Sequence, residues 1–201
     1  MGVTGTGKSR LSDDLATHFR GEIINSDKMQ VFKGLEIVTN KITHGEKQGV
    51  RHYLLGEIEP DSNFTGEDFC VKYIVYIENC LKTQCVPIIV GGSNSYIEKF
   101  MDDPVFMFKY KYNSCFIWID VEQSVLNREL TRGLMKWSMQ IQRLINEKMW
   151  PVHHIIANDV FEEDGKEAVD EAWRNTVLQP CLDIVKRFLK NDDHNISIEC
   201  T

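Results

Sequence analysis

Short apolar runs alternate with stretches of helical periodicity through the first two thirds of the chain. Four runs are typical of strands: residues 22–27, 52–55, 86–90 and 115–121. Three stretches carry apolar side chains at helical spacing: residues 11–19, 65–81 and 95–101. The second of these begins with Thr65-Gly66-Glu67-Asp68, which resembles a capping box. Strands that alternate with helices predict a parallel, doubly wound α/β sheet.

The last third of the chain is helical in pattern. Apolar spacing predicts three helices there: residues 137–149, 169–177 and 182–189. Pro151 ends the first of them, residues 162–170 are typical of a charged connection, and Pro180 precedes the last helix. We expect residues 1–130 to form an α/β core and residues 131–201 to form a shortened helical segment that completes it.

The chain opens on a glycine-rich stretch that matches the pattern G-x-x-x-x-G-K-[ST] in full. Its members are Gly2, Val3, Thr4, Gly5, Thr6, Gly7, Lys8 and Ser9. Small residues let consecutive backbone N–H groups surround a diphosphate, Lys8 adds a positive charge, and Ser9 offers a hydroxyl to Mg²⁺. The helix that follows directs its positive end toward the same anion. The motif predicts phosphate binding and leaves open whether the phosphates belong to ATP, another nucleotide or a different diphosphate.

A phosphate loop of this kind normally follows a buried strand, and here only Met1 precedes it. We therefore expect a P-loop NTPase-like parallel sheet, flanked by helices, that lacks its first strand. The carboxyl-terminal part of the chain is expected to be helical.

Polar residues gather where the first predicted strand ends, in Asn25-Ser26-Asp27-Lys28. An acid at a strand end is often a cap, but so dense a polar cluster suits a substrate pocket in which Asp27 accepts a proton from an amine. The strand over residues 86–90 ends at Gly91-Gly92-Ser93, which is equally typical of a helix start and of a ligand contact. Ligands of parallel sheets bind at the carboxyl ends of the strands, where we expect the phosphate loop and both clusters.

Composition and charge narrow the partners. The 201 residues carry a net charge of −7, which argues against a broad nucleic-acid footprint. The six cysteines form no C-x-x-C and no zinc spacing, so we interpret them as reduced thiols. No apolar run reaches about 18 residues, so we expect no membrane span. The chain shows no targeting segment, and we expect a cytoplasmic location by default.

Together these motifs resemble the plant adenylate isopentenyltransferases, the cytokinin-forming branch of the dimethylallyltransferase (IPP transferase) family. Beyond the phosphate loop, the resemblance extends through residues 24–41, 50–55, 64–69, 90–96, 114–121, 142–150 and 171–173. It implies that a dimethylallyl group passes from dimethylallyl diphosphate to the exocyclic N6 of ATP, ADP or AMP. In this family that transfer is the first step of cytokinin biosynthesis.

The resemblance also implies a role for each candidate residue. Lys8 and Ser9, with Mg²⁺, would stabilise the leaving diphosphate, and Thr4 would contact its bridging oxygen. Asp27 would orient N6 and take its proton. Three polar residues would line the acceptor pocket with it: Ser26, Gln30 and Ser93. These assignments agree with the chemistry, because fixed donors and a cation stabilise the charge that develops on the diphosphate.

The residue after Asp27 indicates which branch of the family the chain resembles, and therefore which acceptor it uses. Lys28 follows the acid as expected of the adenylate branch, whereas the tRNA branch tends to carry Ser there. The acidic net charge and the lack of a carboxyl-terminal Cys/His zinc module also favour a free nucleotide over tRNA. We expect a monomer, and a plastid location is open for a full-length family member.

After residues 126–130 the sequence departs from the pattern of the family. There the family continues through a long helical region, whereas this chain passes almost directly to Gln142-Arg143-Leu144. Lys136-Trp137 stands where the family has an Arg-Gln pair of the donor-binding wall. An inactive shortened copy that retains only phosphate binding is therefore the alternative. A tRNA dimethylallyltransferase and a small P-loop kinase are less favoured.

Overall fold

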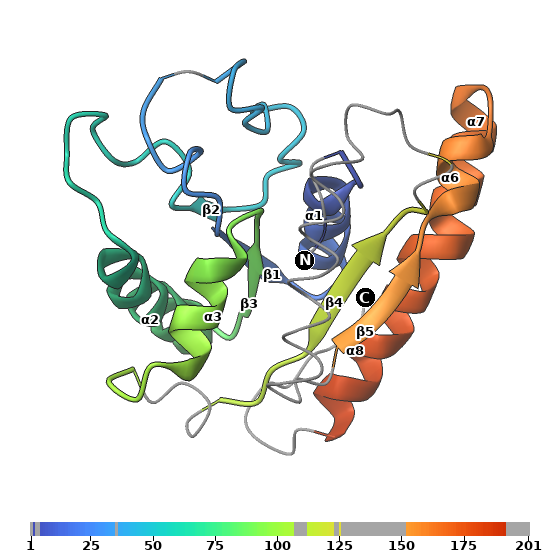
Figure 1. Ribbon diagram of the computed structural model, residues 1–201. Coiled ribbons are helices and arrows are strands. Elements are labelled where there is room, and N and C mark those ends of the chain that lie inside the picture. The colour runs from blue at the N-terminus through green and yellow to red at the C-terminus, as the bar shows by residue number, and fades with distance from the viewer. Residues whose placement is uncertain are drawn as a thin grey trace. The chain divides into compact units, whose positions relative to one another are not determined.

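The computed structural model describes residues 2, 5–34, 36–106, 112–122, 125 and 152–191. The chain divides into a first unit, Met1–Lys8 with Ser114–Asp193, and a second unit, Ser9–Asn113 with His194–Thr201. Each unit holds a parallel sheet with helices packed on it, so the predicted α/β class is confirmed (Figure 1). No helix in these described ranges has an apolar stretch long enough to cross a membrane.

The sheet of the second unit has three parallel strands in the order β2-β1-β3. Their bounds are Gly21–Asn25 for β1, His52–Tyr53 for β2 and Val86–Val90 for β3. β1 pairs with β3 along its whole length, and with β2 over two residues. Ile23 and Ile24 of β1 are both fully buried on opposite faces of the sheet. β1 is therefore the centre of this unit's core.

The helices of the second unit pack beside this sheet. Their bounds are Lys8–His18 for α1, Gly66–Lys82 for α2 and Asn94–Asp102 for α3. The predicted capping box is confirmed at the start of α2, where Thr65 and Asp68 exchange side-chain and backbone hydrogen bonds. α2 contacts β1, β3 and α3, and edge-to-face rings join Tyr73 to Phe69 and Phe100.

The first unit is built on a two-stranded parallel sheet. β4 spans Phe116–Asp120 and β5 spans Val152–Ile156, paired over all five residues. Gly2 forms a parallel bridge to Ile119, which places the start of the glycine-rich loop beside β4. The other elements in the described part of this unit are α6 (Asn158–Glu162), α7 (Lys166–Ala172), the π-helix η1 (Trp173–Leu178) and α8 (Gln179–Asn191).

The helical end of the chain corrects two expectations. The charged connection predicted over residues 162–170 is wrong, because α7 already begins at Lys166. The predicted break at Pro180 is also wrong, since α7, η1 and α8 follow one another without interruption (Figure 1). Pro180 lacks the N–H that would bond to the carbonyl four residues earlier, and the wider π-turns lie directly before it. The helix predicted over residues 137–149 lies outside the described residues.

The sheets also differ from the sequence pattern. The pattern predicts one parallel sheet, whereas the described strands form two. β5 falls where no strand is predicted, because His153 and His154 interrupt its apolar run. Pairing with β4, rather than local hydrophobicity, makes this segment a strand.

A buried acid–imidazole pair joins α1 to the start of β2. Asp13 Oδ1 lies 3.3 Å from His52 Nε2, and both side chains are at most 5% exposed. Burial raises the pKa of Asp13 to about 7, and the nearby carboxylates of Asp14 and Glu46 add to the rise, which Lys47 opposes. Burial also lowers the pKa of His52. Burial therefore favours the neutral form of both groups, a carboxylic acid beside an uncharged imidazole.

Replacing this acid by an amide tests the cost of ionising it. In the parent the folded state holds the Asp13 proton more tightly than the unfolded state does, so stability is lost as pH rises from about 4 to 7. Asp13→Asn does not titrate, so it should gain at least roughly 3 °C on the parent between pH 5 and pH 8 in thermal melts. The lowered pKa of His52 makes stability rise with pH, but His52 is present in both proteins, so its contribution cancels in the difference between their melting temperatures. A melting difference that does not change with pH would contradict this account.

Candidate active site

Asp27 lies two residues beyond the end of β1, in a turn that the side chain of Asn25 holds. The Asn25 amide donates to the carbonyl of Leu54 at 2.8 Å and to that of Asp27 at 3.1 Å. Asn25 Oδ1 accepts a hydrogen bond from the backbone N–H of Asp27 at 3.2 Å. One buried side chain therefore closes the turn and ties it to the residue after β2.

The Asp27 carboxylate has one engaged oxygen and one open oxygen. Oδ1 accepts from the backbone N–H of Met29 at 2.8 Å and from that of Gln30 at 3.4 Å. Oδ2 has no hydrogen bond with a described residue, and a Cβ added to Gly92 would lie 3.2 Å from it. A carboxylate held through one oxygen can accept a proton on the other, as a general base must.

The Gly91–Ser93 segment lies directly against this turn, as the shared strand edge predicts. The backbone N–H of Ser93 donates to the carbonyl of Ser26 at 3.3 Å, and Ser93 Oγ accepts from the N–H of Lys28 at 3.0 Å. A Cβ added to Gly91 would come within 2.4 Å of the Ser26 carbonyl carbon. Glycine is therefore required for the two segments to approach this closely.

Of the predicted pocket residues, one is buried and another has its side chain bonded within the protein. Ser26 is fully buried beneath the turn. The side-chain amide of Gln30 donates to the carbonyls of Thr39 at 2.9 Å and Asn40 at 3.1 Å. Gln30 therefore anchors the loop between β1 and β2, and contact of either side chain with an acceptor stays a prediction.

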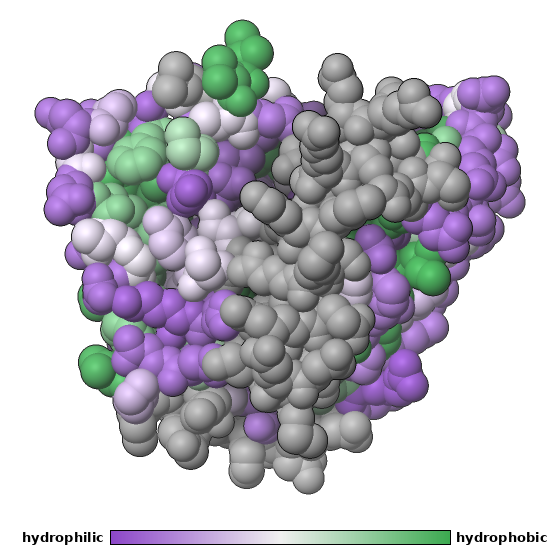
Figure 2. Space-filling model, viewed as in Figure 1, coloured by the Kyte–Doolittle hydropathy of each residue, from purple (hydrophilic) through white to green (hydrophobic). Residues whose placement is uncertain are grey.

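The anchored loop leaves two of its apolar residues exposed. Ile37 and Val38 are 94% and 82% exposed, whereas the Lys41 side chain is 5% exposed and donates to the carbonyl of Gly34. Figure 2 shows hydrophobic side chains projecting at the top of the view, where Figure 1 draws the loop between β1 and β2. The loop is therefore held by its polar anchors and by the buried Val31, while Ile37 and Val38 stay exposed.

The glycine-rich loop has glycines where its backbone requires them. Gly5 and Gly7 have φ angles of +88° and +81°, in the left-handed region that favours glycine. Lys8 is the first residue of α1, whose amino end carries a partial positive charge. Val3 and Thr4 lie outside the described residues, so the contact of Thr4 with a bridging oxygen stays a prediction.

Trp173 supports this loop, a role that the sequence did not predict. A Cβ added to Gly7 would come within 2.5 Å of the indole ring, so the ring lies directly against the loop backbone. Trp173 is 3% exposed and is the first residue of the π-helix η1. In the sequence it is one apolar position of a helical pattern, and nothing local to it indicates a partner at the other end of the chain.

Ser9 is the described candidate for a metal ligand. It lies in the first turn of α1 and is exposed. The described ranges contain no group of three His, Cys, Asp or Glu residues that could hold a metal ion by itself. Mg²⁺ commonly takes one or two protein ligands and completes its shell with phosphate oxygens and water. Ser9 therefore fits a metal ion that binds together with a diphosphate.

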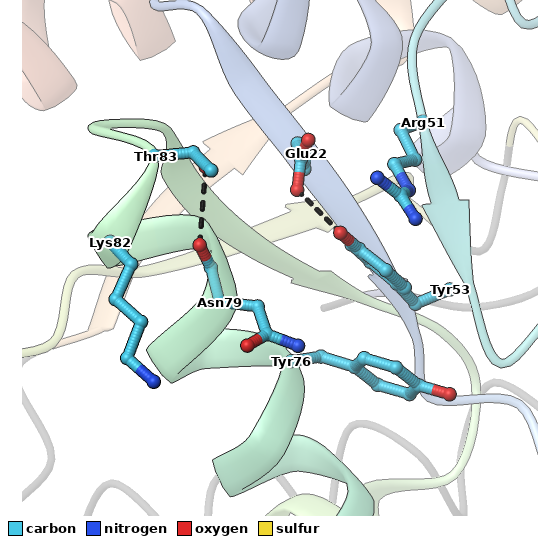
Figure 3. Close-up of a pocket in the computed structure, with 7 residues that line it drawn as sticks. All are labelled: Glu22, Arg51, Tyr53, Tyr76, Asn79, Lys82 and Thr83. Atoms are coloured by element: carbon cyan, nitrogen blue, oxygen red, sulfur yellow. Dashed lines mark hydrogen bonds between the residues drawn. The ribbon is translucent and has the colours of Figure 1, made fainter.

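A pocket of about 360 Å³ lies at the other end of β1. Its lining residues are Glu22, Arg51, Tyr53, Tyr76, Asn79, Lys82 and Thr83 (Figure 3). Glu22, the second residue of β1, accepts a hydrogen bond from the Tyr53 phenol at 2.8 Å, and Tyr53 stacks on Tyr76. Because Asp27 follows the opposite end of β1, this pocket is distinct from the predicted acceptor site.

A glycine-rich loop at the start of a helix and a carboxylate beyond a parallel strand are the features of an α/β protein with a P-loop-like fold. The IPP transferase family model matches residues 30–145. Adenylate isopentenyltransferase 5, chloroplastic, of Arabidopsis thaliana is 36% identical over 269 residues, covering 98% of this chain and 81% of that protein. This chain therefore belongs to the IPP transferase family.

Two further comparisons extend this result. Adenylate isopentenyltransferase 3, chloroplastic, of Arabidopsis thaliana is 54% identical over 127 residues, 63% of this chain and 38% of that protein. The crystal structure of a tRNA isopentenylpyrophosphate transferase from Bacillus halodurans matches with a TM-score of 0.57 at 20% identity, covering 94% of this chain and 81% of that one. That likeness shows the shared fold. The 269-residue alignment is longer than this chain, so the first relative has segments with no counterpart here.

Two glycine substitutions separate backbone strain from the contact with Trp173. Gly5→Ala and Gly7→Ala each place an alanine at positive φ. The new Cβ at position 7 would meet the Trp173 indole, whereas nothing in the described part of the chain lies within 4 Å of a Cβ at position 5. Each should cost about 1 kcal/mol of stability for the backbone, and Gly7→Ala should cost about 1–3 kcal/mol more for overpacking. Denaturant unfolding of both variants measures the difference. Equal losses would show that Trp173 does not constrain the loop.

Proposed function

We propose that this protein transfers a dimethylallyl group from dimethylallyl diphosphate to the exocyclic N6 of a free adenine nucleotide. The observation that carries the proposal is the Asp27 carboxylate, held through Oδ1 at the carboxyl end of β1 and open at Oδ2. Membership of the IPP transferase family and relatives named adenylate isopentenyltransferases support the same reaction. The protein acts as a monomer in this proposal.

The reaction exchanges one bond for another at the allylic carbon. The lone pair of N6 forms a C–N bond as the C–O bond to the diphosphate breaks, and the diphosphate leaves with that electron pair. Asp27 Oδ2 takes the proton that N6 loses. The carboxylate also orients the amine, because its other oxygen is fixed by the N–H of Met29.

The leaving diphosphate would be held by the glycine-rich loop. Backbone N–H groups of the loop, the amino end of α1 and the ammonium of Lys8 stabilise the charge that the departing oxygen gains. Mg²⁺, when bound through Ser9 and the diphosphate, would neutralise further negative charge.

Product analysis tests the reaction and the role of Asp27. The parent protein with dimethylallyl diphosphate, Mg²⁺ and AMP, ADP or ATP should yield an N6-prenylated nucleotide in mass spectrometry. Asp27→Asn keeps the shape but cannot take the proton, so turnover should fall by roughly 10²–10⁴ with little change in nucleotide binding. The exposed Asp61→Asn is the matched control and should leave turnover unchanged. Parent-like turnover by Asp27→Asn would rule out the base, and no product from the parent would favour the inactive shortened copy.

The choice of acceptor is a separate prediction. Lys28 stands where the adenylate branch is expected to carry Lys, and this favours a free nucleotide. The net charge of −7 favours it as well, because tRNA binding draws on clustered positive charge. In a competition assay with equal concentrations of AMP and unmodified tRNA, labelled prenyl groups should accumulate on AMP. Preferential labelling of tRNA would assign the protein to the other branch of the family.

A further inference from the structure

The second glycine of the Gly91–Ser93 segment stands beside the open oxygen of Asp27. A Cβ added to Gly92 would lie 3.2 Å from Asp27 Oδ2. Apart from the two chain neighbours of Gly92, no other atom of a described residue would lie within 4 Å of that Cβ. Among these residues, a side chain at position 92 would therefore meet only the candidate base.

The neighbouring Gly91 has a different reason to be glycine. A Cβ at Gly91 would come within 2.4 Å of the Ser26 carbonyl carbon, so the close approach of the two segments excludes a side chain there. Gly92 has no such contact with a described backbone atom, and its φ lies outside the left-handed region that favours glycine. Folding alone would therefore accept an alanine at position 92. What glycine preserves there is room on one side of Asp27 Oδ2.

This room lies where a ligand of the sheet is expected. β1 and β3 are parallel and pair in full register, so the segments that follow them, with Asp27 and Gly92, lie at the same edge. Ligands of parallel sheets bind outside the carboxyl ends of the strands. Glycine also lets a ligand approach the backbone closely, because no Cβ stands in the way. An acceptor that enters between the two segments can thus reach Asp27 Oδ2 across Gly92.

A methyl group and an amine would compete for this side of the carboxylate. A nitrogen that donates a hydrogen bond to a carboxylate lies about 2.7–3.2 Å from the oxygen. The Cβ of an alanine at position 92 would lie 3.2 Å from the same oxygen. The methyl group would therefore cover the side of Oδ2 that faces Gly92 and keep a donor from it.

We propose that Gly92 is a specificity-determining residue of the acceptor site: its lack of a side chain leaves open the side of Asp27 Oδ2 on which the exocyclic amine of the nucleotide donates its hydrogen bond. The inference rests on the proposed function, which puts that amine at Asp27. The amine approaches across Gly92, and the small residue there serves amine recognition rather than folding.

An alanine at position 92 separates recognition from folding. Gly92→Ala adds a methyl group without positive-φ strain, so the melting temperature should stay within about 3 °C of the parent. The variant should nevertheless lose at least about tenfold in kcat/KM for AMP, the effect of a lost hydrogen bond to a charged group. Gly45→Ala is the matched control, because Gly45 also lies outside the left-handed region and its Cβ would meet no described atom within 4 Å. It should match the parent in both measurements.

The closing experiment compares the binding of two nucleotides by calorimetry: AMP and purine riboside 5′-monophosphate, which lacks the exocyclic amine. The parent and Gly45→Ala should bind AMP at least about tenfold more tightly, because of the two nucleotides only AMP donates this hydrogen bond to Asp27. Gly92→Ala should bind the two with affinities within about twofold of each other, since its methyl group keeps the amine from Oδ2.

The outcomes separate the inference from the proposed function. The role of Gly92 would be overturned if Gly92→Ala kept the parent's preference for AMP, weakened both nucleotides equally, or melted more than about 10 °C below the parent. A parent that prefers AMP but forms no prenylated nucleotide would overturn the proposed transfer, while loss of that preference in Gly92→Ala would still support the inference. A parent that forms product but binds both nucleotides equally would overturn the inference alone.

Discussion

The close approach of two backbones at the ends of β1 and β3 determines the geometry of the candidate acceptor site. β1 and β3 pair in full register, so both strands end at the same edge of the sheet. Gly91 then lies so near the Ser26 carbonyl carbon that any side chain would separate the segments. The hydrogen bonds from Ser93 and Lys28, and the open face beside Gly92, all depend on that contact.

The Asp27 turn and the glycine-rich loop are supported by different elements. The Asp27 turn is held by the hydrogen bonds of the Asn25 side chain and by the close approach of Gly91. The glycine-rich loop begins beside β4 and packs on Trp173 of η1. A two-substrate transfer needs a rigid holder for each reactant, because orientation of the reacting groups contributes much of the rate.

Sequence reasoning worked where the signal is local. The periodicity located α2 and β3, and the capping box at Thr65 marked the start of its helix, because these features depend on neighbouring residues. The same reasoning failed for β5, whose strand conformation depends on pairing with β4. It also missed Trp173, whose partner Gly7 is remote in the sequence, and the burial of Ser26 beneath its own turn. A role that depends on contact between residues remote in the sequence produces no pattern in the local spacing of apolar residues.

In the proposed reaction an adenine amine binds against the open oxygen of Asp27. A crystal structure of the protein with AMP measures this directly. We expect the exocyclic N6 within about 2.6–3.2 Å of Asp27 Oδ2, with Oδ1 still bonded to the N–H of Met29. AMP bound with N6 away from Asp27, or in the pocket lined by Glu22 and Tyr53 at the other end of β1, would contradict it.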